Sequence, residues 1–564
     1  MRKISFYILI LFSLFSFKSF CQTLTLKING KNKLETQVLD SITYLKSHHD
    51  YISISSEIND IQKKLYNLGY IDNELGNIKK TTDTSFSSQI NLKNKYKSIS
   101  IYYDKTDLSK SILNSISKDV FDDYFILNFK DIEHSLNFIN SEISKKGHPF
   151  TKLKLSNIRI KDTSSIEAFL NIDIPKRKRT INSIIIKGYK KFPVAYLKNL
   201  LKIRTNQFFD IETIKNKTNR LKNLNFANEI KPPEVLFSKD STSLYLYIEK
   251  TKSNTFDGFL GFGTNEETKK LVFDGYLNLQ LINNLNLGES LKLLYKTDEN
   301  NQQTFEINTT LPYLFRTPVG ADFSLRIFKR DSSFTTINQS AKIHYQINDE
   351  HKFYTGISAS ESNNLLKNNT STIITDYKTN YHTVSYEFIK RQPYSTLFPT
   401  KTYIYIETGF GNRKALNSKE KQQQVSIDAS NIFNLNKNNS IYLRFNSLIL
   451  NSNTYFENEL LRFGGINSIR GFEENSIFAS QFSFLNTEYR FRLNNSTYIH
   501  SIIDGGFFEN KISNIKEKIF GYGFGFGIIT KAGLLKFNYA NGKNENTRFK
   551  FSNSKIHLSL VASF

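Results

Sequence analysis

The chain has 564 residues, more than one ordinary domain uses, so we expect two or more folded units. Its single cysteine, Cys21, lies near the start, which excludes a disulfide scaffold and thiol chemistry for the rest of the chain. The formal net charge of +24 favours contact with anionic lipid surfaces, although a biased genome rich in Lys and Asn codons would produce the same balance.

Residues 1–21 have the pattern of a secretory signal peptide. A basic start is followed by an apolar run, Ile4–Phe17, and then by Cys21, so we predict cleavage before Gln22. A lipoprotein anchor on Cys21 is the alternative, and bulky Phe20 disfavours it. No later stretch approaches the ~20 apolar residues of a membrane-spanning helix. An exported chain rarely meets nucleic acid, so we expect no such partner.

Three segments between residues 22 and 250 share a helical pattern that ends in Gly or Asn. The ends fall at Gly69, Gly147 and Asn225, two intervals of 78 residues, and a constant period marks tandem modules. Gly and Asn readily take the left-handed conformation that ends a helix. The helix-spaced apolar residues are Ile58, Ile61, Leu65 and Leu68, then Ile132, Leu136, Ile139 and Ile143, and then Ile211, Ile214, Leu221 and Leu224.

Each repeat has a short strand before its helices and a strand pair after them. We therefore predict three α+β modules, over residues 22–96, 97–175 and 176–250. Open sheet edges in such modules can pair with an extended peptide, and the alternative is that the modules are spacers. The basic run Lys176–Arg179 is interpreted as a solvated linker, with lipid head-group contact as the alternative.

Residues 251–564 predict an all-β transmembrane barrel of about sixteen antiparallel strands. Strand-like segments of about nine to thirteen residues recur there, the first near Phe256 and the twelfth near Ile477. In the final segment, KIHLSLVASF, apolar residues alternate with polar ones, which suits lipid on one face and a polar lumen on the other. A soluble sandwich also alternates, and the predicted signal peptide and the aromatic terminal residue Phe564 disfavour it.

The stretch RFGGINSIRGFEENS, residues 462–476, interrupts this alternation. It follows the eleventh strand in a loop placed at 450–476, on the extracellular side if the modules are periplasmic. We predict that it folds back into the lumen, where Arg470 would find Glu488 and Asp504 on the next strands. A buried ion pair that loses one partner typically costs about 3–5 kcal/mol, so this contact would hold the loop inside. The glycines that permit close backbone approach are Gly464, Gly465 and Gly471.

The sequence GGINSIRGF resembles the (V/I)RG(F/Y) loop of the BamA/TamA superfamily of outer-membrane assembly proteins, the bacterial surface antigen family. The resemblance covers the chain after residue 21 and includes GFGFGIITKAGLLKFNYA (523–540). It implies polypeptide-transport-associated (POTRA) modules in the periplasm, a barrel in the outer membrane, and a loop in which Arg470, Gly471 and Phe472 lock onto acidic wall residues. Three modules resemble TamA, whereas BamA has five, so the central assembly role is not implied.

The expected function is assisted insertion of outer-membrane proteins, with unfolded clients, outer-membrane lipids and accessory periplasmic or lipoprotein subunits as partners. The barrel must close between its first and last strands, and interior glycines weaken the first. These are Gly258, Gly261 and Gly263. A transporter for one secreted protein, as in two-partner secretion, and a passive pore are the alternatives. No nucleophile or phosphate-binding motif occurs, so we expect no enzyme activity and no cofactor or metal.

Overall fold

The computed structural model describes residues 23–264, 271–297, 302–366, 373–392, 395–416, 418–531, 533–545 and 554–563. The predicted signal peptide and Phe564 lie outside the described residues. The chain divides into two compact units. The first ends at Thr180 and takes in Phe208–Glu212, and the second contains the rest of the third module together with the barrel.

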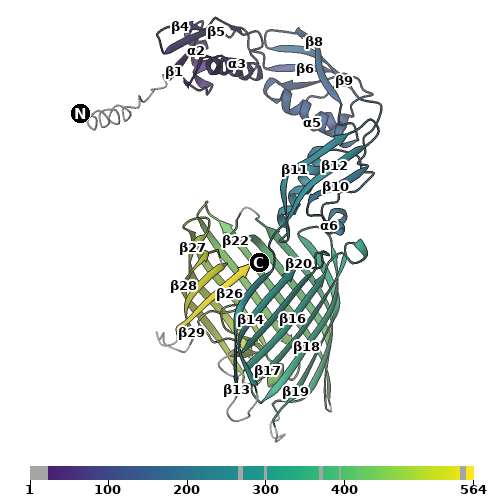
Figure 1. Cartoon of the computed structure of the whole chain (residues 1–564), viewed down its shortest axis with the longest axis vertical. Coiled ribbons are helices and arrows are strands. Elements are labelled where there is room, and N and C mark those ends of the chain that lie inside the picture. Colours follow the sequence, from purple (N-terminus) through teal and green to yellow (C-terminus); the bar gives the residue numbers. More distant parts are fainter. Residues whose placement is uncertain are drawn as a thin grey trace, which may run out of the picture. The chain divides into compact units, whose positions relative to one another are not determined.

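The first unit holds two small mixed sheets with helices against them (Figure 1). The first sheet has the order β2-β1-β5-β3, with β4 also on β5, and the second has the order β7-β6-β9-β8. In each, the first strand is parallel to the last, which requires the helical crossover between them. The elements are β1 (Leu24–Gly30), α2 (Lys33–Ser41), β2 (Ser47–His48), α3 (Tyr51–Asn67), β3 (Glu74–Leu75), β4 (Lys79–Lys80), β5 (Ser85–Asn91), β6 (Ser98–Tyr102), α4 (Lys110–Asn114), β7 (Tyr124–Asn128), η1 (Phe129–Asp131), α5 (Ile132–Lys145), β8 (Lys152–Ile160) and β9 (Ser165–Asp173).

The predicted left-handed residue follows the helix at two of the three positions. Gly69 and Gly147 have φ of 94° and 96°, the left-handed conformation expected after α3 and α5. A Cβ on Gly69 would lie 1.9 Å from the Tyr96 carbonyl oxygen, so only glycine fits there. The prediction was wrong for Asn225, which has no positive φ because a 3-10 turn ends the third helical segment instead. Leu68 is also 42% exposed, since α3 ends before it.

The third module, in the second unit, has a three-stranded sheet of order β10-β12-β11. Strands β11 and β12 form the strand pair predicted after the helices, and the register between them shifts around Pro232 and Pro233 of β11. Among the described helices, none is long and apolar enough to cross a membrane. The elements are β10 (Ser183–Gly188), α6 (Val194–Asn199), α7 (Ile211–Thr218), η2 (Asn219–Asn223), β11 (Ala227–Phe237) and β12 (Thr242–Lys250).

This module is hydrogen-bonded to turns at one rim of the barrel. The Asn283 side-chain amide donates to the Tyr189 hydroxyl at 2.8 Å, and the Tyr196 hydroxyl donates to the Gly288 carbonyl at 3.2 Å. Asn199 contacts the β16–β17 turn, donating to the Arg316 carbonyl at 3.1 Å. All three contacts reach connections that follow even-numbered barrel strands, so the connections after odd-numbered strands lie at the opposite rim.

Gly288→Val is expected to undock α6 from the β14–β15 turn. Gly288 has φ of 78°, and a Cβ there would lie 2.2 Å from the Tyr196 ring. The valine would therefore overpack the interface and reduce the free energy of docking by about 1–3 kcal/mol or more. Limited proteolysis between residues 250 and 255 should then accelerate while the barrel stays folded. Leu287→Val, at a neighbouring exposed side chain, is the control, and equal cleavage of both variants would contradict the expectation.

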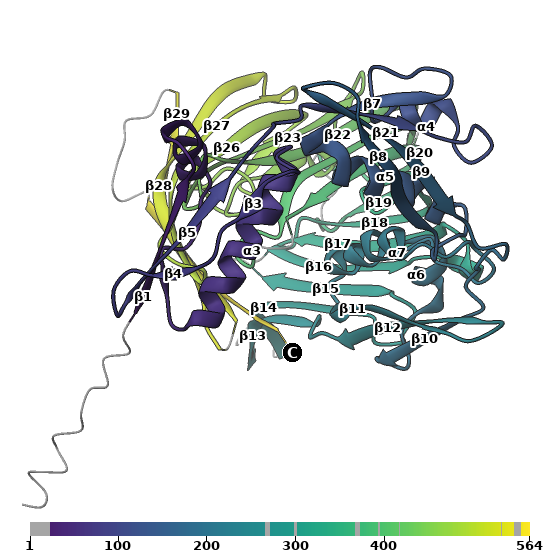
Figure 2. The ribbon, with the colours of Figure 1, turned by 90° about the horizontal axis from the view of Figure 1, so that it is seen from above.

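The predicted sixteen-stranded antiparallel barrel is confirmed, with its strands following one another around the wall (Figure 2). The elements are β13 (Thr255–Thr264), β14 (Leu271–Ile282), β15 (Ser290–Thr297), β16 (Gln302–Leu311), η3 (Leu314–Arg316), β17 (Val319–Arg330), β18 (Phe334–Gln346), β19 (His351–Asn364), β20 (Tyr377–Arg391), β21 (Thr400–Ala415), β22 (Ser418–Asn434), β23 (Asn439–Asn451), β26 (Gln481–Arg492), β27 (Thr497–Asn510), β28 (Ile515–Ile529), β29 (Leu534–Asn544) and β30 (Ser554–Ser563).

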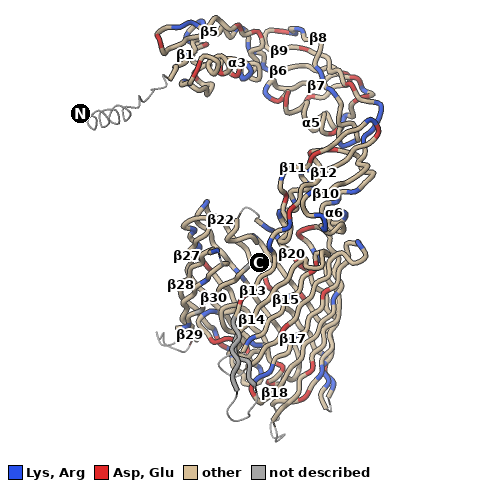
Figure 3. Tube along the Cα trace, viewed as in Figure 1, with Lys and Arg blue, Asp and Glu red and all other residues tan. Residues whose placement is uncertain are grey.

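The barrel strands place apolar side chains outward and polar ones in the lumen, as their alternation predicts. On β17, Phe323 is 50% exposed on the outer face, whereas Asp322 accepts a hydrogen bond from Thr310 at 2.6 Å and also contacts His344. Arg444 and Asp428 form a further ion pair inside at 2.7 Å. Basic and acidic residues occur along both the modules and the barrel (Figure 3), so the net positive charge is not confined to one segment.

Candidate functional site

The connection after β23, the eleventh barrel strand, folds into the barrel and is called here the lumen loop (residues 452–480). It contains η4 (Glu457–Glu459) and a two-stranded ribbon of β24 (Leu461–Phe463) and β25 (Ile477–Ala479). Ile477 was predicted to begin the twelfth barrel strand. That prediction was wrong, because Ile477 pairs within the loop and the barrel strand β26 begins at Gln481.

The middle of the lumen loop packs against inward-facing aromatic side chains of the wall. Phe463 and Ile469 are 3% and 0% exposed, and Phe463 stacks on Phe482 of β26 with ring centroids 4.3 Å apart. This buried cluster also contains Ala479, Phe484, Phe508 and Ile519, with Phe472 partly buried against it. Burial of these apolar side chains drives the loop toward the wall, and the polar contacts then fix its register.

Arg470 makes the first anchor of the lumen loop, with Glu488 on β26 and Asp504 on β27. Its Nε and Nη2 donate to the two Asp504 carboxylate oxygens at 2.8 and 2.6 Å, and its backbone N–H donates to the same carboxylate at 3.0 Å. Its Nη1 donates to Glu488. Arg490 donates to the other Glu488 oxygen at 2.7 Å. The planar guanidinium suits this arrangement because it offers a fork to one carboxylate and a further N–H to a second.

Glycines let the backbone on both sides of the first anchor touch the wall. Gly471 has φ of 91°, and a Cβ on it would lie 2.3 Å from the backbone nitrogen of Gly542 on β29. A Cβ on Gly521 of β28 would lie 2.3 Å from the Arg470 carbonyl oxygen. The loop glycine and the two wall glycines therefore form one close backbone contact across β28 and β29.

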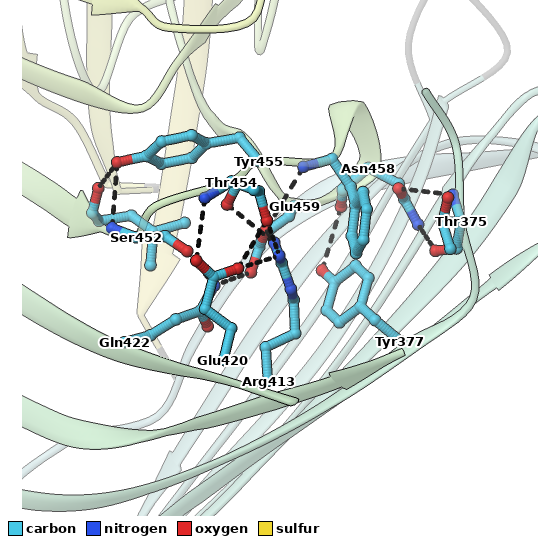
Figure 4. A network of polar contacts seen from close by, with 12 residues as sticks. Thr375, Tyr377, Arg413, Glu420, Gln422, Ser452, Thr454, Tyr455, Asn458 and Glu459 are labelled. Carbon is cyan, nitrogen blue, oxygen red and sulfur yellow. Dashed lines mark hydrogen bonds and ion pairs between the residues drawn. The ribbon is translucent and has the colours of Figure 1, made fainter. Parts of the chain in front are cut away.

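Arg413 on β21 makes a second anchor, which the sequence had not suggested (Figure 4). Arg413 is 1% exposed, and its Nη2 donates to Glu420 of β22 at 2.6 Å. Its Nη1 donates to Glu459 of the lumen loop and, at 3.1 Å, to the Thr454 carbonyl. Gln422 also donates to Glu459 at 2.6 Å. The guanidinium thus lies between one carboxylate of the wall and one of the loop.

Asn458 extends the second anchor to two more strands. Its amide donates to the Thr375 carbonyl at 2.9 Å (Figure 4). The same amide donates to Ser362 of β19 at 2.8 Å. The Tyr377 hydroxyl of β20 donates to the Asn458 carbonyl at 3.2 Å. Arg413 therefore holds the lumen loop to β21–β22, as Arg470 holds it to β26–β27.

The seam between the first and last barrel strands is short. β13 pairs with β14 over ten residue pairs, whereas its described pairing with β30 consists of Thr255–Ser563 and Phe256–Ala562. Gly258, two residues further on, has φ of 144°, and a Cβ there would lie 2.1 Å from the Tyr276 carbonyl oxygen. β13 thus turns into a glycine-only conformation where its described pairing with β30 stops. Gly261 and Gly263 lie further along β13, opposite β14 residues.

Within the described ranges, no three His, Cys, Asp or Glu side chains gather as ligands for a metal ion would. The lumen keeps a cavity of about 510 Å³ beside the loop, lined by wall residues and by Asn458, Glu459 and Arg462. Among the described residues, the arrangement is a barrel with a short seam between its first and last strands and a loop held across its interior.

Residues 283–556 match the Omp85 superfamily domain, and residues 179–251 match the POTRA description "Surface antigen variable number repeat". The chain belongs to the Omp85 superfamily. It is an outer-membrane barrel protein with a POTRA domain, which confirms the predicted BamA/TamA-type resemblance.

Several solved structures share the fold at low sequence identity. BamA from Haemophilus ducreyi lacking POTRA domains 1–3 is 14% identical with a TM-score of 0.50, over 82% of this chain and 99% of that one. CdiB from Acinetobacter baumannii is 14% identical with a TM-score of 0.51, over 84% and 90%. CdiB from Escherichia coli is 12% identical with a TM-score of 0.51, over 91% and 97%. No curated protein sequence matches the chain.

Sequence reasoning named the three residues of the first anchor, and this Omp85 structure brings them together. It missed the second anchor, because Arg413 is one of many charged residues that alternate along a strand. It also missed Gly521 and Gly542, although the glycine at every second position in GYGFGFG (521–527) signals a strand that another backbone approaches closely.

Proposed function

We propose that this Omp85 protein assists the insertion of other β-barrel proteins into the outer membrane by opening its β13–β30 seam. The observation that carries the proposal is the short ladder between Thr255–Phe256 and Ala562–Ser563, next to a first strand that bends at Gly258. Opening costs few backbone hydrogen bonds there, and it exposes strand edges that an incoming client strand can pair with. Elsewhere, adjacent strands share long ladders, such as β20 with β21.

The modules are proposed to face the periplasm and to receive unfolded clients along their sheet edges. In the second sheet the edge strands are β7 and β8, and in the third they are β10 and β11. In the described structure no further strand pairs with the outer side of β8. An extended segment can join such an edge through main-chain hydrogen bonds, which tolerates many client sequences.

Cysteines at Thr255 and Ser563 are expected to abolish assembly activity when oxidised. Facing residues of antiparallel strands have Cα atoms about 4.5–5.5 Å apart, within disulfide range, so the bond would lock the seam. The measurement is insertion of a tagged barrel client into vesicles that contain the full-length protein, before and after reduction. Activity should return with the reductant.

A matched control is the pair Val384→Cys with Thr408→Cys, which join β20 to β21 in an uninterrupted ladder. The parent protein, whose one cysteine is Cys21, is oxidised and reduced in parallel to control for any effect of that residue. Full activity of the oxidised seam variant, or equal inhibition by the control disulfide, would contradict the proposal.

Depletion of the protein, followed by proteomics of the outer membrane and the medium, separates the alternatives. Loss of many barrel proteins, or of one subclass, is the expected result. Loss of one secreted protein with barrels unchanged would indicate a dedicated transporter. For a passive pore, deletion of residues 462–476 would leave single-channel recordings unchanged.

A further inference from the structure

Two consecutive acidic residues directly follow the first anchor and contact the wall on opposite sides of the seam. Glu473 pairs with Lys555 on β30, the last strand, at 2.9 Å. Glu474 pairs with Lys296 on β15, the third strand, at 3.4 Å. The seam between β13 and β30 lies between these two contacts along the wall.

The loop glycines Gly464 and Gly465 lie against Glu473 and Glu474. Gly464 has φ of 115°, and a Cβ on it would lie 2.4 Å from the Glu473 carbonyl oxygen. Gly465 has φ of 98°, and a Cβ on it would lie 2.0 Å from the Glu474 Oε2 atom. The Ser476 hydroxyl donates to the Glu473 carbonyl at 2.8 Å, which closes the turn. The two glycines therefore leave room for the Glu473 carbonyl and for the Glu474 carboxylate.

The two ion pairs differ in what they connect. The first anchor and the Gly471 contact hold this part of the loop to β26, β27 and β29, on the same side of the seam as β30. The Glu473–Lys555 pair continues that attachment, whereas the Glu474–Lys296 pair crosses to the other side. The loop also touches β17 and β19, but these strands lie farther round the wall from the seam than β15 does.

We propose that Glu474 is a gate-positioning residue: its ion pair with Lys296, supported by Glu473 with Lys555, ties the two sides of the seam together from inside the barrel. Separation of β13 from β30 moves β15 away from the anchored loop, so the Glu474–Lys296 pair must break when the seam opens. This inference rests on the proposed function, and it assigns to the lumen loop the control of that opening.

The test measures seam opening directly, without a client. Spin labels at Phe256→Cys and Ala562→Cys, a facing pair across the seam, report the distance distribution in full-length protein in lipid nanodiscs. Glu474→Gln is expected to raise the fraction of long distances several-fold, and Glu473→Gln to raise it less. Gly465→Ala should act like Glu474→Gln, because its Cβ displaces the Glu474 carboxylate. The exchanged pair Glu474→Lys with Lys296→Glu should restore the parent distribution.

The salt dependence of seam opening is an independent test, because both ion pairs are partly exposed and dissolved salt therefore screens them. Raising the salt to about 0.5 M should increase opening in the parent and add little in Glu474→Gln. The matched control is Glu387→Gln, which removes a lumen ion pair of similar exposure, with Lys352 at 3.1 Å. This pair lies near the start of β19 and the end of β20, at the other end of these strands from Ser362 and Tyr377, which contact the loop.

Each outcome decides the inference. An unchanged distribution in Glu474→Gln, an equal effect of Glu387→Gln, or failure of the exchanged pair to restore closure would overturn it. A rise in opening with unchanged client insertion would support the Glu474 contact and count against the proposed function instead. Loss of client insertion with an unchanged seam distribution would overturn the Glu474 inference alone.

Discussion

Arg470→Ala is expected to release the first anchor and to destabilise the folded barrel by about 3–5 kcal/mol, the range for removing one partner of a buried ion pair. Asp504 is 1% exposed, and its described side-chain hydrogen bonds all come from Arg470. Glu488 keeps Arg490 as a partner. Most of the cost should therefore arise at Asp504, which is left charged and buried.

We therefore expect Arg470→Ala with Asp504→Leu to be more stable than Arg470→Ala alone, because the double variant removes the unpaired carboxylate. Arg470→Lys should recover only part of the loss, because a lysine has no fork for Asp504. Urea unfolding of the barrel in detergent measures the stability. Protease cleavage within residues 462–476 in sealed vesicles reports release of the loop.

Arg492→Ala serves as the control, since Arg492 lies at the end of β26 and its guanidinium contacts the Lys437 carbonyl at a turn outside the lumen loop. Parent-like stability and protection of Arg470→Ala would show that the first anchor does not hold the loop. Equal destabilisation by Arg492→Ala would show that the effect is not specific to the anchor.

Arg413→Ala is expected to release the other end of the lumen loop, at a similar cost of about 3–5 kcal/mol. Arg413 lies between the Glu420 and Glu459 carboxylates and stacks 4.0 Å from the centre of the Phe456 ring. Its removal leaves two carboxylates facing each other without the intervening cation. Protease cleavage should therefore appear near residues 452–460 and not at 462–476, which distinguishes this variant from Arg470→Ala.

A double-mutant cycle with Glu459→Gln isolates the loop contact of Arg413. The cost of Arg413→Ala should fall when Glu459 is already neutral, because less negative charge is then left unpaired. Lys414→Ala, at the exposed neighbouring position, is the control. Strictly additive losses for Arg413→Ala and Glu459→Gln would contradict a direct anchor between the two side chains.

The first anchor could be predicted because each of its parts has a local signal. Arg470 stands in a glycine-rich stretch that cannot continue a strand, and Glu488 and Asp504 sit at lumen-facing positions of the next two strands. The second anchor has no such signal. Arg413 and Glu459 are 46 residues apart, and only the path of the lumen loop across the barrel brings them together.

The seam also combines features that the sequence predicts with features that only the structure shows. The sequence identified the glycines of β13, but not where the strand would bend, because a glycine's φ depends on the neighbours that surround it. Gly258 takes its positive φ against the Tyr276 carbonyl, and Gly465 takes its positive φ against the Glu474 carboxylate. These contacts depend on strand register and on loop packing, which no local pattern contains.

By itself, the sequence determined the tandem modules, the sixteen alternating strands and the loop that interrupts them, because helical and strand periodicity are properties of neighbouring residues. It also determined the loop arginine and its acidic candidates. Only the tertiary structure decided that the loop begins after Asn451 and ends before Gln481, that Arg413 holds it as well, and that Glu473 and Glu474 reach opposite sides of the seam. The physical reason is that closing the barrel brings together residues that lie far apart along the chain. Which charged side chains pair in the lumen therefore depends on how the barrel closes.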